Sequence, residues 1–217
     1  MAALRLYAIS IDEARDFVGA SPATAERARA AAADLFEAPA VPTRGSGLFT
    51  RLFGRSPRTP EPPDPGRPTV ADLETVLDGH YPTPDRALPC WQVLEHLVAR
   101  SAWGHHEVDL DDQGLEHFDF AVVRAGGSAE TGLARLVDTD ARIGLSQIPE
   151  LRVGYMPYAQ VRNTGARLAR LEVTAEDEYA AAIDGLRHFL GQYGGWAAEA
   201  LDSESPTPDL LAFHTVG

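Results

Sequence analysis

The fold is decided by the opening of the chain, Leu4-Arg5-Leu6-Tyr7-Ala8-Ile9-Ser10-Ile11-Asp12-Glu13. The side chains alternate over residues 4–9, which is typical of a short strand. Ser10 and Glu13 have the spacing of a capping box, so we expect the strand to lead into a helix that Gly19 ends.

The last residues of the chain form a second strand-like cluster, which runs from Asp209 to Val216. Between the two ends the sequence shows about eight helical segments, and the other strand-like runs are few and well separated. This pattern predicts an α+β fold, a predominantly helical domain around a small sheet that contains both terminal strands. We expect residues 1–217 to form a single domain.

Proline dominates residues 39–69, where it removes backbone donors and fixes φ, so we expect a Pro-rich surface insertion or linker there. A short helix within it would gather four apolar side chains on one face and leave arginine outside that face. This candidate interaction patch consists of Leu48, Phe49, Arg51, Leu52 and Phe53. The same apolar residues could instead hold the insertion against the body of the domain, and both interpretations stay open.

The charge of the chain excludes several classes of function. A net charge of -13 at pH 7 repels phosphate backbones, so we expect no nucleic-acid partner. All 19 basic residues are arginine, and the absence of lysine rules out Schiff-base chemistry and a P-loop lysine. Because arginine and alanine richness together are typical of GC-biased coding, we do not take the number of arginines as a sign of a binding site.

The sequence also favours a cytoplasmic protein. Cys90 is the single cysteine, so no disulfide can form within the chain. No window approaches the roughly 20 apolar residues of a membrane span, and the opening residues lack the basic and apolar regions of a signal peptide. We expect no membrane span.

One segment offers side chains of the types that bind metals. In a strand beginning at His105, the side chains of His105, Glu107 and Asp109 would point to one face, which makes a three-ligand metal site possible. The helical His-x-x-x-His pair of many zinc enzymes is absent. The alternative is an ordinary edge strand followed by a helix cap.

No set of catalytic residues is visible in the sequence. Cys90 has no basic neighbour that would lower its pKa. Glu95 and His96 are adjacent on a helix and must face different directions, with Glu95 at the solvent edge. The sequence therefore favours a non-enzymatic protein, and we expect no cofactor. Trp103 and Tyr158, which lie beside turns, are the best aromatic candidates for an interface or a ligand pocket.

The order of segments resembles the YfbM-like proteins, bacterial domains of unknown function. The resemblance rests on the opening run from Leu6 to Ala14, the helix from Trp91 to Val98, the run from Arg152 to Pro157, and the terminal strand from Leu210 to Phe213. It implies an α+β bacterial cytoplasmic domain with a role near toxin and immunity systems. It supplies no catalytic residues.

These observations lead to one hypothesis and two alternatives. The favoured function is that of an acidic protein-interaction module of the immunity type, whose partner is a protein, and a basic one, because large negative charge steers such encounters. The first alternative is a metal-dependent hydrolase that uses the face of His105, Glu107 and Asp109. The second alternative is a small-ligand sensor with an aromatic pocket near Trp103 and Tyr158.

Overall fold

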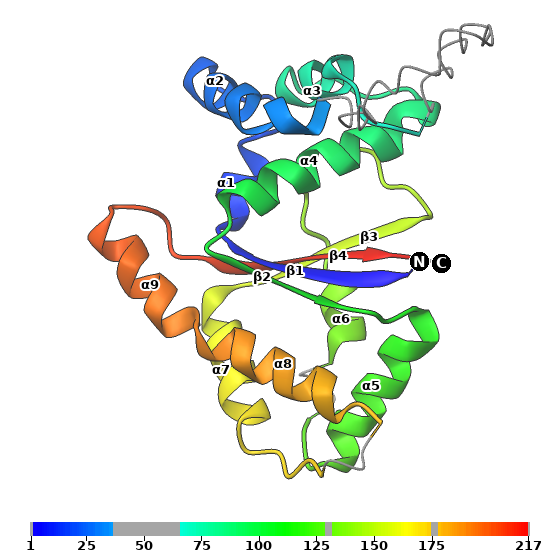
Figure 1. The fold of residues 1–217 in the computed structure, drawn as a ribbon, viewed down its shortest axis with the longest axis vertical. Helices are drawn as coiled ribbons and strands as arrows, with labels where there is room; N and C mark the ends of the chain where they lie inside the picture. Colours follow the sequence, from blue (N-terminus) through cyan, green and yellow to red (C-terminus); the bar gives the residue numbers. More distant parts are fainter. Residues whose placement is uncertain (1, 37–65, 129–131, 175–177, 217) are drawn as a thin grey trace, which may run out of the picture.

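The structure, a computed structural model, describes residues 2–36, 66–128, 132–174 and 178–216. At its centre lies an antiparallel sheet with the strand order β2-β1-β4-β3. The strands are β1 (Ala3–Ile9), β2 (Gly104–Val108), β3 (Leu151–Met156) and β4 (Asp209–Thr215). The two terminal strands β1 and β4 are neighbours, as predicted from the sequence, and the chain ends lie at the same end of the sheet (Figure 1).

Helices cover both faces of the sheet (Figure 1). One face carries α1 (Ile11–Arg15), α2 (Pro22–Ala31), α3 (Val70–Leu77) and α4 (Ala87–Ser101), with short 3-10 turns at Ala33–Phe36 and Pro84–Arg86. The other face carries α5 (Asp112–Arg124), α6 (Leu133–Val137), α7 (Tyr158–Leu168), α8 (Ala180–Gly191) and α9 (Tyr193–Asp202). The predicted α+β class is confirmed. Among the described residues, no helix combines the length and the apolar character that a membrane crossing requires.

Alternation along β1 divides the interior into two cores. Leu4 and Leu6 belong to the core beneath α5–α9, whereas Tyr7 and Ile9 belong to the core beneath α1–α4. The central strands are therefore buried on both faces, and this explains the continuous apolar run at residues 210–213.

The capping box expected at Ser10 and Glu13 does not form, because the Ser10 side chain makes no cap hydrogen bond. A carboxylate from the other end of the chain replaces it. The backbone N–H of Ile11 donates to Oδ2 of Asp209 over 3.1 Å, and the N–H of Tyr158 donates to Oδ1 of the same residue over 2.8 Å. Asp209 therefore caps the first turns of both α1 and α7.

Two helix boundaries differ from those that the sequence predicts. The pair Gly194-Gly195 predicts a break between two helices, but the break lies earlier, at Gln192, and both glycines belong to α9. Gln192 itself keeps right-handed helical backbone angles, with φ -79° and ψ -16°, so the break between α8 and α9 is local. Ser128, which follows the pair Gly126-Gly127, predicts the start of a helix that runs to Val137, but this helix begins only at Leu133, where the backbone N–H donates over 2.7 Å to Asp119. By contrast, Thr69 predicts the N-cap of a helix, and the structure confirms this cap.

His214, in β4, is a fully buried titratable side chain. Its Nδ1 lies 3.2 Å from Nη2 of Arg152, and its Nε2 lies 3.0 Å from the carbonyl oxygen of Leu110. Because a guanidinium can only donate, Nδ1 must accept and Nε2–H must donate to Leu110, so both nitrogens are satisfied by the neutral ring. Arg152 is held by ion pairs with Asp112 and Asp138. Burial lowers the pKa of His214, and the charge of Arg152 acts in the same direction.

We expect Asp209→Ala to lower the free energy of unfolding by about 2 kcal/mol, since each lost helix cap costs about 1 kcal/mol. Urea denaturation at pH 7.5 measures the loss. Ser21→Ala is the matched control, because Ser21 caps α2 alone through a hydrogen bond from the Thr24 N–H. Equal losses in the two variants would contradict the double cap.

We expect stability to fall with acidification because of His214. The unfolded chain binds a proton at this residue near pH 6.5, whereas the folded ring binds it only at lower pH. The His214 contribution is therefore complete above pH 6.5 and is lost as the pH falls, with a slope of up to about 1.4 kcal/mol per pH unit. Denaturation between pH 7.5 and 5 measures this slope. An identical slope in His214→Gln would assign it to other groups.

Candidate functional site

The candidate site is the free edge of the sheet at β2. Among the described residues, β2 pairs with β1 alone, which leaves its outer edge unpaired (Figure 1). His105 and Glu107 are exposed and lie opposite Tyr7 and Arg5, so they face the side of the sheet that carries α4. Their neighbour His106 points to the side that carries α8.

Two glycines let α8 and α9 approach β2 closely. A β-carbon at Gly185 would lie 2.8 Å from Cε1 of His106, so only glycine allows α8 to rest on this ring. A β-carbon at Gly104 would overlap the indole of Trp196, whose ring therefore lies against the backbone of β2. Phe189 stacks on His106 with a centroid distance of 5.7 Å. The rings of Trp196, His106 and Phe189 therefore pack against β2 on the face that carries α8 and α9.

We call the cavity at the start of β2 the aromatic hollow. It has a volume of about 420 Å³, and its walls include Trp103, His105, His106, His188 and Trp196. Nε2 of His106 is buried and has no hydrogen-bond partner among the described residues. Burial lowers the pKa of His106, and the nearby imidazoles of His105 and His188 lower it further. The described part of the chain places no carboxylate in these walls, so the aromatic hollow offers aromatic rings and imidazoles.

We call the cavity at the other end of β2 the acidic hollow. It has a volume of about 570 Å³ and lies between residues 108–111 and residues 178–182 at the start of α8. The described residues in its walls include Asp109, Asp111 and Glu178 and no basic side chain. Within the described part of the chain, Asp109 and Glu178 form no ion pair, whereas Asp111 caps α5 through the N–H of Gly114. This end of β2 is therefore strongly negative.

The structure separates the three residues predicted to bind a metal. His105 and Glu107 share one face of β2, as expected. However, β2 ends at Val108, so Asp109 lies beyond the strand and lines the acidic hollow instead. In the described ranges, no three His, Cys, Asp or Glu side chains form a group that could hold a metal ion. The metal site stays a prediction without a supporting cluster.

The aromatic candidates lie in different places. Trp103 is half-buried and lines the aromatic hollow. Tyr158 begins α7, is half-buried against the core beneath α5–α9, and lines none of the walls around β2. Neither of the two cavities at the ends of β2 brings Trp103 and Tyr158 together. The patch of Leu48, Phe49, Arg51, Leu52 and Phe53 lies outside the described residues, as does most of the segment 39–69.

The three side chains that the sequence analysis considered for catalysis, Glu95, His96 and Cys90, are hydrogen-bonded or protonated. Glu95 was expected at the solvent edge, but it is mostly buried and forms a bidentate ion pair with Arg5 while it accepts from the Tyr7 hydroxyl over 2.9 Å. His96 points elsewhere, to the carbonyl of Ala31. Burial raises the pKa of the Cys90 thiol to about 11, so the thiol is protonated at neutral pH.

Sequence reasoning missed the residues that α8 and α9 bring to β2. His188 and Trp196 are more than 80 positions away from His106, and no local pattern connects them. Gly185, in the interior of a helix, was the available signal, because an interior helical glycine often marks a close approach of another element.

A scan of known family models found no match to this chain, and neither did searches of curated proteins and of solved structures.

We expect Gly104→Ala to displace the Trp196 indole and to lower the free energy of unfolding by about 1–3 kcal/mol, the usual cost of overpacking. Tryptophan emission and urea denaturation measure the two effects. Gly195→Ala is the matched control, since a β-carbon there meets no atom within 4 Å. Wild-type emission and stability in Gly104→Ala would show that the indole does not lie against β2.

Proposed function

We propose that the protein is a non-enzymatic interaction module that adds an extended, basic segment of a partner protein to the free edge of β2. The observation that carries this proposal is the position of β2, an edge strand with a hollow at each end. An unpaired strand edge presents a row of backbone donors and acceptors, which an extended peptide can satisfy by strand addition.

The carboxylates near β2 favour a partner segment with basic side chains. Glu107 is exposed on one face of β2, and its cross-strand neighbour Arg5 is already paired with Glu95. Asp109 and Glu178 line the acidic hollow on the other side of the strand end. A strand added beside β2 would place alternate side chains on these two faces, so arginine or lysine on either face would meet a carboxylate.

The aromatic hollow supplies the second element of recognition. An added strand that reaches Trp103 would place one side chain over the rings of Trp103 and Trp196. Rings with large area and a polar group are typical anchors of protein interfaces. We therefore expect the preferred segment to carry an apolar or aromatic residue about five positions from its basic end, the length of β2.

The single cysteine bears on the cellular compartment of this module. A protein with one buried cysteine suits a reducing compartment, and we place it in the bacterial cytoplasm. The immunity-type role implied by the resemblance to YfbM-like proteins is one case of this function, in which the partner is a basic protein that the module neutralises. The ligand-sensor and metal-hydrolase alternatives lack a comparable observation at β2.

The direct test uses a fluorescein-labelled decapeptide of alternating arginine and valine. We expect salt-sensitive binding detected by fluorescence polarisation, with amide shift changes in the 15N spectrum confined to β2 and its hollows. The double variant Glu107→Gln, Asp109→Asn should weaken binding about tenfold, because each exposed charge pair contributes up to about 1 kcal/mol. The matched control is Asp16→Asn, Glu26→Gln, which removes two exposed charges near α1 and α2.

A second peptide separates strand addition from simple charge attraction. It has the same sequence but carries N-methyl groups at alternate residues, which remove the donors needed for a ladder while keeping every charge. Equal affinity for both peptides, or equal losses in the two double variants, would contradict the proposal.

A further inference from the structure

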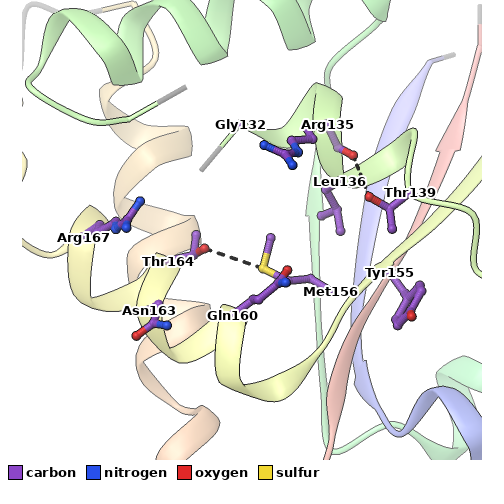
Figure 2. Close-up of a pocket in the computed structure, with 10 residues that line it drawn as sticks. All are labelled: Gly132, Arg135, Leu136, Thr139, Tyr155, Met156, Gln160, Asn163, Thr164 and Arg167. Atoms are coloured by element: carbon purple, nitrogen blue, oxygen red, sulfur yellow. Dashed lines mark hydrogen bonds between the residues drawn. The ribbon is translucent and has the colours of Figure 1, made fainter. Parts of the chain in front are cut away.

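A third cavity lies on the far side of the sheet from α4, between α6 and α7 and above the end of β3 (Figure 2). Its volume is about 430 Å³. Figure 2 shows Arg135 extending from α6 toward α7, and Arg167 standing on α7. Gln160 and Asn163 of α7 complete the polar wall, and Met156 with Leu136 forms the apolar floor. We call this cavity the arginine hollow.

The charge of the arginine hollow opposes that of the whole protein. The chain carries 32 acidic residues against 19 arginines, yet the described residues that line this cavity include two arginines and no carboxylate. The surrounding sequence has the same bias, since residues 151–171 include Arg152, Arg162, Arg167 and Arg170 but neither Asp nor Glu. A cationic cavity in so acidic a molecule concentrates small anions at one place.

The local hydrogen bonds leave the guanidinium of Arg135 available to a ligand. Thr139 donates to the backbone carbonyl of Arg135, and Thr164 donates to the sulfur of Met156, so both hydroxyls point back to the protein. The guanidinium of Arg135 has no hydrogen-bond or ion-pair partner in the described part of the chain. Guanidinium groups bind carboxylate and phosphate oxygens through paired N–H donors, and side-chain amides can bind the remaining oxygens.

We propose that the arginine hollow binds a small organic molecule that carries a doubly charged oxyanion, such as a phosphate monoester or a dicarboxylate. Arg135 holds the oxyanion, Arg167 adds positive charge from α7, Gln160 and Asn163 donate amide hydrogen bonds, and the carbon skeleton lies on the floor of Met156 and Leu136. A cavity of about 430 Å³ is in the range of natural small-molecule sites. This site is independent of the β2 edge.

Isothermal titration calorimetry of the full chain tests the site with three probes: inorganic phosphate, glucose 6-phosphate and succinate. We expect saturable binding of at least one organic probe, tighter than that of inorganic phosphate because the carbon skeleton adds contact. Glucose 6-phosphate against succinate decides between the phosphate and carboxylate sources. Arg135→Gln should weaken binding tenfold or more, the usual effect of losing a charge-assisted hydrogen bond.

Arg170→Gln is the matched control, because it removes the same charge from an exposed position that does not line the cavity. It should change the affinity less than twofold. Failure of all three probes to bind at 10 mM would overturn the proposal, and so would equal losses in Arg135→Gln and Arg170→Gln. Binding of a single-stranded oligonucleotide that tightens with its length would also overturn it, in favour of a surface for polyanions.

Discussion

The carboxylate of Asp209 joins the two layers of helices at one end of the sheet. β4 lies between β1 and β3, and Asp209 pairs with Ile9 while its neighbour Leu210 pairs with Met156. Both flanking strands end beside Asp209, and the chain turns to α1 on one face and to α7 on the other. One carboxylate between two departing chains can satisfy the first N–H of each helix. The Tyr193 hydroxyl adds a bond to the Asp209 carbonyl, which ties α9 to the same point.

The positions of β1 and β4 in the sheet determine which strands have a free edge. β1 and β4 occupy the middle of the sheet, so the short strand β2 forms one of its two edges. The fold then supports this edge with rings from α8 and α9, which approach because residues 104 and 185 are glycine. Exposed carboxylates at an edge also discourage pairing with copies of the same acidic chain, while they favour a basic strand. In the proposed function, this difference would make the edge selective for a basic partner strand.

Local patterns in the sequence predicted the strands and helices, because alternation, helix caps and proline act over a few residues. Thr69 with Asp72 shows this, since the whole capping box lies within one turn. A helix cap that comes from a distant part of the chain could not be predicted from local patterns. Ser10 fits the pattern of an N-cap, but the N–H of Ile11 is capped by Asp209, which is 198 positions away. The same difference between local patterns and long-range contacts applies to the candidate site. The segment 105–109 was recognised from its residue types, whereas the hollows around it depend on His188, Trp196 and Glu178, and the arginine hollow depends on helix packing.

The measurement that tests this account most directly is hydrogen exchange of the free protein, resolved residue by residue across the sheet. If β2 is an open edge, its outward N–H groups exchange orders of magnitude faster than the N–H groups of β1 and β4, which are bonded on both sides. Alternate residues within β2 should then differ strongly. Uniform slow exchange along β2, equal to that of β1 and β4, would show that the edge is already covered and would contradict the account.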